Sequence, residues 1–270
     1  MDIPPQLETE PPEPAEPMPL GARLLNVFAV PSEVFENVRM APRASTSWIV
    51  PLLIACVVGV VASLILFSRP AIVQEVRNQQ QAARTKQVEK FDKLVEQGKM
   101  KQEDADRAIQ GMDKVMEFTG KAGFLKIAGS AGAVVASIFR IFWWAFALWL
   151  IALLILKSRI RYSKALEVVG LSSMIEVLGM VVTLLLQVNL SRTMATPSLG
   201  LAVSEFDPSN RMHVVLGAIN LVQVWMIIVM ALGLSRLAGV PFARASLMVI
   251  GFWLLQTAIL VLIGGGLALM

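Results

Sequence analysis

Residues 246–270 read SLMVIGFWLLQTAILVLIGGGLALM, a stretch of 25 residues without one ionisable side chain. A helix that crosses a bilayer needs about 20 mainly apolar residues, so this stretch is long enough to span one. Four further stretches of similar length and character precede it, at 48–67, 137–156, 166–188 and 212–234. The sequence therefore predicts an all-α protein, a polytopic membrane helical bundle with five transmembrane helices.

The composition of the chain agrees with a membrane protein. It is 56% hydrophobic and 16% charged, with a mean hydropathy of +0.65, whereas soluble domains carry about 25% charged residues. The net charge of +4 is compatible with nucleic acid, but the basic residues stand mostly beside the predicted spans, where they orient the protein. We expect the lipid bilayer as a partner, and no nucleic acid. Cys56 is the one cysteine, so we expect neither a disulfide framework nor a zinc cluster.

The first 47 residues divide into two predicted segments. Residues 1–19 hold seven prolines and four glutamates, a composition that buries too little apolar surface to fold, so we predict a disordered acidic, proline-rich tail. Residues 20–47 alternate apolar and charged side chains, which favours an amphipathic segment at the level of the lipid headgroups. Packing against the bundle explains this pattern as well as lipid contact does.

A large polar segment, residues 68–123, separates the first two predicted spans. Apolar residues recur at helical spacing on both sides of Gly98. Glycine readily takes the left-handed conformation that ends a helix. We therefore predict an extramembrane helical hairpin that turns at Gly98, with charged faces that are solvated surface more than a binding site.

Basic residues cluster in the short loop after the second predicted span. The loop reads KSRIRYSK and holds Lys157, Arg159, Arg161 and Lys164 without an acid. Short loops rich in lysine and arginine stay in the cytoplasm, so these four residues are the predicted determinants of topology. With five spans, the N-terminus shares their side. We predict a multi-pass protein of the bacterial inner membrane, with a cytoplasmic N-terminus and with the hairpin and the C-terminus on the opposite side.

Residues that carry chemistry are sparse in this chain. Catalysis needs a convergent nucleophile, base and orienting group, or several metal ligands. His213 is the one histidine, and it has no histidine or cysteine partner near it in the sequence. We therefore expect no catalytic residues, no metal site and no cofactor, and rank a membrane enzyme third among the possible functions.

Polar side chains inside the predicted spans are more informative. Glu176 lies near the middle of the third span, Asn220 and Gln223 lie in the fourth, and Gln256 lies in the fifth. An acid at membrane depth usually faces the bundle interior or a water-filled cavity, and it often marks a functional site. These four residues form the candidate intramembrane polar site. Whether Glu176 acts in function or only holds helices together is left open by the sequence.

The expected partner of Glu176 follows from the predicted span boundaries. A second span that begins at residue 137 places Arg140 close to the outer edge of the membrane. Glu176 then lies about a dozen residues deeper, or roughly 18 Å at 1.5 Å per residue, so direct pairing is not expected. The sequence therefore predicts a neutral Glu176 that is hydrogen-bonded to Asn220, Gln223 or Gln256.

Several short motifs accompany this layout. They are FAVPSEVF at 28–35, Pro51 in the first span, RYSKAL at 161–166 and GLSS at 170–173. In these motifs and in its five spans, the chain resembles bacterial members of the Yip family over residues 20–270, with the polar hairpin as a lineage-specific insert. The resemblance implies a five-pass helical bundle with a cytosolic N-terminus. Eukaryotic members of that family associate with Rab-type GTPases and act in vesicle traffic.

The Asp-Leu-Tyr-Gly-Pro signature of the eukaryotic relatives has no counterpart here, so the resemblance does not carry a GTPase partner over to this chain. Together with the missing catalytic set, the resemblance predicts a non-enzymatic scaffold or adaptor that organises membrane partners or lipids. The expected protein partner is another membrane protein or a second copy of this chain. The alternative is a transporter, or a subunit of one, that uses Glu176. Against this alternative, the sequence has no inverted repeat and no matched pair of broken helices.

Overall fold

The structure is a computed structural model that describes residues 18–203, 206–207 and 210–262. The predicted tail, apart from its last two residues, and the last eight residues of the fifth predicted span lie outside the described residues. The described part is all-helical, and the predicted fold class is confirmed. Its elements are α1 Leu20–Ala29, α2 Pro31–Met40, α3 Thr46–Leu66, α4 Pro70–Glu96, α5 Gln102–Thr119, α6 Ala122–Leu150, the π-helical turn η1 Ile151–Ile155, α7 Tyr162–Leu190, the 3-10 turn η2 Leu199–Ala202, α8 Arg211–Ala218, α9 Leu221–Ala238 and α10 Phe242–Leu262.

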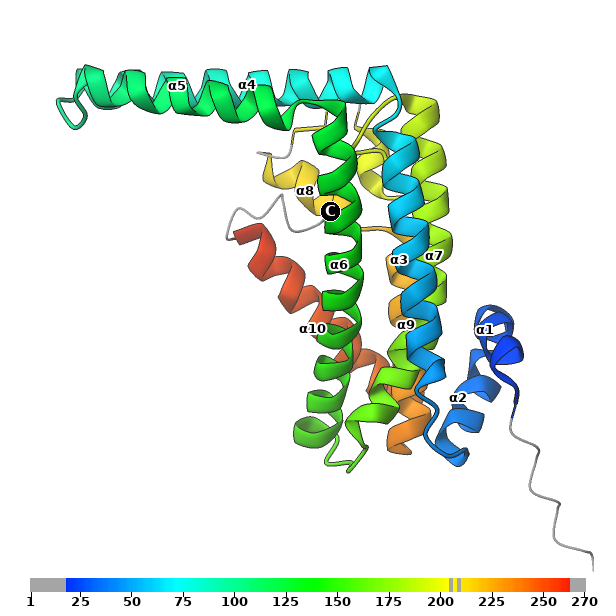
Figure 1. The fold of residues 1–270 in the computed structure, drawn as a ribbon. Helices are drawn as coiled ribbons and strands as arrows, with labels where there is room; N and C mark the ends of the chain where they lie inside the picture. The colour runs from blue at the N-terminus through cyan, green and yellow to red at the C-terminus, as the bar shows by residue number, and fades with distance from the viewer. Residues whose placement is uncertain (1–17, 204–205, 208–209, 263–270) are drawn as a thin grey trace, which may run out of the picture.

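Five of the described helices are long and apolar enough to cross a membrane: α3, α6 together with η1, α7, α9 and α10. Four of them, α3, α6, α7 and α9, stand side by side as a bundle, whereas α10 tilts away from α9 (Figure 1). Much of the surface of α3 and α10 is apolar and exposed. Such a surface requires lipid around it, so the chain is a multi-pass membrane protein.

Small residues allow these helices to approach one another closely. A Cβ atom placed on Gly170 of α7 would lie 2.4 Å from the Cα of Trp48 in α3, and one placed on Gly59 of α3 would lie 2.9 Å from the Cβ of Ala133 in α6. Backbones packed at this distance gain van der Waals contact, which is a main source of helix association in lipid. The GLSS motif at 170–173 is therefore a packing motif.

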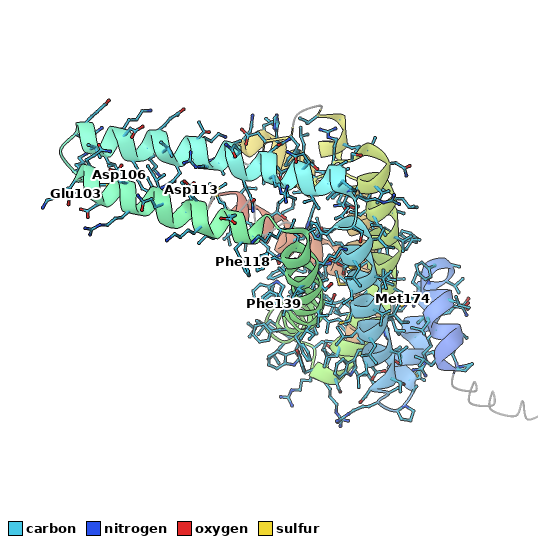
Figure 2. The ribbon with its side chains drawn as sticks, turned by 45° about the horizontal axis from the view of Figure 1, so that its top comes forward. Glu103, Asp106, Asp113, Phe118, Phe139 and Met174 are labelled. Carbon is cyan, nitrogen blue, oxygen red and sulfur yellow. The ribbon has the colours of Figure 1, made fainter. Side chains whose placement is uncertain are left out.

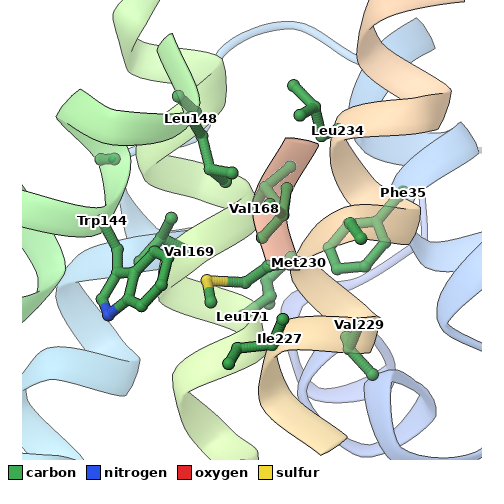
Figure 3. Packing of buried hydrophobic residues seen from close by; sticks show 14 of the residues in the cluster. Phe35, Trp144, Leu148, Val168, Val169, Leu171, Ile227, Val229, Met230 and Leu234 are labelled. Carbon is green, nitrogen blue, oxygen red and sulfur yellow. The ribbon is translucent and has the colours of Figure 1, made fainter. Parts of the chain in front are cut away.

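The core of the bundle joins α2, α6, α7 and α9. Trp144 and Leu148 come from α6, Leu171 from α7 and Met230 from α9, and they surround one space that Phe35 of α2 also reaches (Figure 3). All five side chains are nearly or fully buried. The amphipathic segment thus packs its apolar face against the bundle, where Val27, Val34, Phe35 and Val38 are completely buried.

The second spanning helix extends well beyond the predicted span at its N-terminal end. α6 begins at Ala122, 15 residues before the predicted start at 137. Gly123, Gly129 and Gly132 all lie within the helix. A Cβ atom on Gly129 would lie 2.7 Å from the ring of Phe67. Gly129 therefore serves contact between helices, and the predicted span 137–156 is the C-terminal part of a longer helix.

The fourth predicted span, 212–234, is two helices. α8 ends at Ala218 and α9 begins at Leu221. Asn220 caps α9, because its side-chain oxygen accepts hydrogen bonds from the backbone N–H groups of Val222 and Gln223. The backbone at the start of η2 pairs with the break between α8 and α9. The Leu199 N–H donates to the carbonyl of Ile219 at 3.1 Å, and the Leu221 N–H donates to the carbonyl of Pro197 at 3.0 Å. These bonds satisfy backbone groups that a helix would otherwise pair internally.

Helical structures lie outside the bundle at its two opposite ends (Figure 1). The lower end in that view carries α1, α2, the loop between α6 and α7, and the turn between α9 and α10. The upper end carries the segment between α7 and α8 and the hairpin of α4 and α5, which extends crosswise to the bundle. The hairpin turns at Gly98, whose φ is +67°. We call this hairpin the arm.

Candidate functional site

An ion pair between Arg140 of α6 and Glu176 of α7 lies inside the bundle. The expectation that these two residues do not pair was wrong, and so was the predicted partner of Glu176. The reason is their depth. α6 and η1 end at Ile155, 15 residues after Arg140, and α7 begins at Tyr162, 14 residues before Glu176. Both residues therefore lie about 21–22 Å from the lower ends of their helices, at the same level.

The ion pair borders a cavity of about 20 Å³ between α3, α6, α7 and α9. This volume is enough for roughly one water molecule. Its lining is mainly apolar and consists of Leu52, Ala55, Ser137, Arg140, Ile141, Trp144, Val169, Ser173, Glu176, Met180 and Met226. Of the predicted polar site, Glu176 alone is among these residues.

The three amides of the predicted site do not converge on Glu176. Asn220 is used as the cap of α9. Gln256 of α10 accepts a hydrogen bond of 2.8 Å from the indole N–H of Trp143 on α6. Gln223 is partly buried, and its backbone N–H donates to Asn220. Asn220 thus holds local structure, and Gln256 joins α10 to α6.

The arrangement of Arg140 and Glu176 is that of an intramembrane clamp. Opposite charges that meet at membrane depth neutralise each other. The guanidinium N–H groups and the carboxylate oxygens also supply one another with the polar contacts that hydrocarbon cannot provide. The Glu176 side chain is 18% exposed and the Arg140 side chain is 37% exposed. The two hydroxyls that line the cavity bond within their own helices, Ser137 to the carbonyl of Ala133 and Ser173 to the carbonyl of Gly170.

A second polar cluster, which the sequence analysis missed, lies at the lower end of the bundle. Glu167 of α7 is 1% exposed. Its Oε1 atom lies 3.2 Å from Nζ of Lys164 and accepts a hydrogen bond of 3.3 Å from the backbone N–H of Ala44, just before α3. The buried Arg23 of α1 donates to Ser47 Oγ of α3 at 3.2 Å. An acid three residues after a lysine at the start of an apolar helix was the available signal.

The four predicted topology determinants all lie at this lower end. Lys157, Arg159 and Arg161 are exposed. Lys164 differs from them, because its ammonium group donates to the carbonyls of Val38, Ala41 and Pro42 at 2.7–3.3 Å. Lys164 thus fastens the segment after α2 to α7, a role that the sequence did not indicate.

The arm is joined to the upper end of the bundle by polar contacts at its base. The Glu75 carboxylate of α4 accepts a hydrogen bond of 2.6 Å from the backbone N–H of Thr193, which follows α7. Arg77 donates to the carbonyl of Gly120 at 3.1 Å. Farther out, Lys86 lies 3.6 Å from a carboxylate oxygen of Asp207. These contacts join the arm to Thr193 and Asp207 in the segment between α7 and α8.

The two helices of the arm are joined midway by a bidentate ion pair. Arg84 of α4 donates to both carboxylate oxygens of Asp113 of α5, at 2.5 and 3.0 Å. The Arg84 guanidinium lowers the pKa of Asp113 from its ordinary value, chiefly through this hydrogen bond. The carboxylate therefore stays ionised at neutral pH, and the pair fixes the register of α4 against α5.

No group of three or more His, Cys, Asp and Glu side chains that could hold a metal ion occurs within the described part of the chain. The features found instead are five apolar helices, an ion pair between α6 and α7, and helical structures at opposite ends of the bundle. They define a polytopic α-helical membrane protein.

A family model for the Yip1 domain matches residues 25–263. The chain therefore belongs to the Yip1 domain family, which confirms the resemblance drawn from the sequence motifs. A comparison with curated proteins and another with solved structures found no match.

Proposed function

We propose that this protein is a non-enzymatic membrane scaffold or adaptor, and that its arm carries the partner-binding surface. The observation that supports this function is the projection of the arm from the bundle (Figure 1). α4 has 27 residues, which corresponds to about 40 Å of helix. The contacts of the arm to the rest of the protein described above lie on α4 from Glu75 to Lys86, so the part beyond them reaches outward with charged, exposed faces.

The ion pair supports a scaffold over the alternative of transport through Glu176. A carboxylate that carries a proton or a cation has to be released from other charges, whereas Arg140 already neutralises this one. The adjoining cavity of about 20 Å³ holds roughly one water molecule. Both features suit a bundle that is held closed.

Photo-crosslinking from the tip of the arm tests the scaffold function. A photoreactive amino acid in place of the exposed Lys99 is expected to give an adduct with one defined membrane protein, or with a second copy of this chain, in native membranes. The matched control carries the same group in place of Arg159, at the lower end. A variant in which a short Gly/Ser linker replaces residues 71–119 should lose the partner on purification. Equal adducts from both positions, or none from the tip, would count against the proposal.

We also propose that the lower end faces the cytoplasm of a bacterial inner membrane, and the arm the opposite side. The exposed Lys157, Arg159 and Arg161 at the lower end support this orientation. In a Cys56→Ser background, Lys101→Cys and Leu199→Cys should react with a membrane-impermeant thiol reagent in intact cells. Arg159→Cys should react only after the cells are opened. The reverse pattern would invert the assignment.

A further inference from the structure

The inner corner between the arm and α6 presents an apolar surface that the bundle does not cover. Val115 and Phe118 of α5 are 60% and 58% exposed, and Ile127 of α6 is 74% exposed. The rings of Phe118 and Phe124 pack across the corner with centroids 5.0 Å apart. Phe118 therefore points toward the descending helix α6, on the side of the arm that faces the membrane. We call Val115, Phe118, Phe124 and Ile127 the inner corner.

The inner corner continues into the lipid-facing surface of α6. Ile127, Val135, Ile138 and Phe142 follow one another at helical spacing and are all exposed. Figure 2 shows Phe118 at the base of the arm and Phe139 farther along α6 on the way into the bundle. An exposed apolar stripe on a helix that crosses the membrane is covered by acyl chains. The same lipid that covers α6 thus extends toward the underside of α5.

The height of the arm above the hydrocarbon follows from the helix contacts. α3 has 21 residues, or about 31 Å of helix, which matches a hydrocarbon thickness of about 30 Å. Gly129 of α6 lies beside Ser63 and Phe67 at the upper end of α3. From Gly129 to the start of α6 at Ala122 is seven residues, so the arm begins about 10 Å above the hydrocarbon.

At that height the arm lies within reach of the headgroups. A helix with its side chains has a radius of about 5–6 Å, so the underside of α5 lies about 5 Å above the hydrocarbon edge. The headgroup layer of one leaflet is about 5–7.5 Å thick. Lys114 and Lys121, exposed beside the inner corner, are long enough to bond phosphate oxygens there.

We propose that the inner corner is a membrane-surface site, in which the base of the arm rests on phospholipid headgroups with Val115 and Phe118 inserted at the boundary of the acyl chains. The arm thus runs along the leaflet instead of standing in bulk water. The inference rests on the fold alone and holds whether or not the arm binds a protein partner.

Spin labels on the full-length chain, in a Cys56→Ser background and in nanodiscs of phosphatidylcholine and phosphatidylglycerol, test this site. Labels at Val115→Cys and Phe118→Cys are expected to relax faster with oxygen, which concentrates in lipid, than with a water-soluble nickel chelate. Gln110 is exposed and lies five residues before Val115, about 140° around α5 from that residue. It gives the matched control for Val115, and Gln110→Cys should show the reverse preference. Val135→Cys supplies the reference for lipid.

Two results would overturn the proposal. If positions 115 and 118 are as accessible to the nickel chelate as position 110, the arm stands in water. If they are shielded from both reagents, another protein or a second copy fills the corner. Circular dichroism and gel filtration of each labelled variant establish that it is folded, and the Val115→Cys label alone decides the question if a label at Phe118 disturbs the ring contact with Phe124.

Discussion

Replacing Glu176 with leucine is expected to lower the free energy of unfolding by about 3–5 kcal/mol, because the change leaves Arg140 without its partner at membrane depth. Glu176→Gln should be destabilising as well, since a neutral amide does not compensate the guanidinium. Thermal unfolding in detergent or nanodiscs, followed by circular dichroism, measures the effect. Glu117→Leu, which changes an exposed acid on the arm, is the control and should alter stability by no more than about 0.5 kcal/mol.

The double variant Arg140→Met, Glu176→Leu separates a structural clamp from a transport site. Removing both charges together should restore most of the stability, because two apolar side chains suit this depth and neither charge is left alone. A scaffold should keep its partner in the double variant. A double variant that is well folded and keeps its partner, yet fails to restore a solute flux in a host lacking the protein, would favour transport.

Gly170→Ala should destabilise the bundle by about 1–3 kcal/mol, because the new methyl group has no space. Its Cβ atom would lie 2.4 Å from Trp48 Cα and 2.8 Å from the carbonyl oxygen of Ser47. Both are backbone atoms, which cannot rotate away, so α3 has to move from α7. The unfolding midpoint of the purified variant measures the loss.

Gly132→Ala is the matched control for this substitution. Gly132 also lies in a spanning helix, but a Cβ atom there would meet nothing within 4 Å. Because alanine favours the helix over glycine, the control should be unchanged or slightly more stable. Equal losses at Gly132 and Gly170 would show that the close contact between α3 and α7 is unimportant for stability.

The sequence predicted those parts of the fold in which one physical signal dominates. The first span was expected at 48–67, and α3 covers Thr46–Leu66. The two agree closely because an unbroken apolar stretch of this length indicates a single spanning helix. The turn of the arm was expected at Gly98, which has the positive φ that glycine favours. The fold class followed from five apolar stretches of spanning length.

The errors arose where one residue type serves two purposes. The small residues before 137, of which Gly129 is a helix contact in α6, were left out of the second span, so Arg140 was assigned the wrong depth. Counting from the connecting loop at 156–161, which is short, would have placed Arg140 and Glu176 at one level. Asn220 looked like a buried amide in a continuous span, but it caps α9. Glu167 was missed because its nearby partner Lys164 was taken only as a topology determinant, and because its other partner, the backbone N–H of Ala44, is distant in the sequence.

The arm also limits how closely other membrane proteins can approach this one. It extends over one sector of the membrane around the bundle, the sector toward which α10 tilts (Figure 1). A neighbour with a bulky extramembrane domain meets the arm up to about 40 Å before it reaches α6. Among the described residues, the side formed by α3 and α7 carries no such projection at the upper end, whereas α1 and α2 project there at the lower end (Figure 1). Crowding is therefore directional at the upper end of this protein, where a neighbour with a large domain at the level of the arm can approach most closely from the α3 and α7 side.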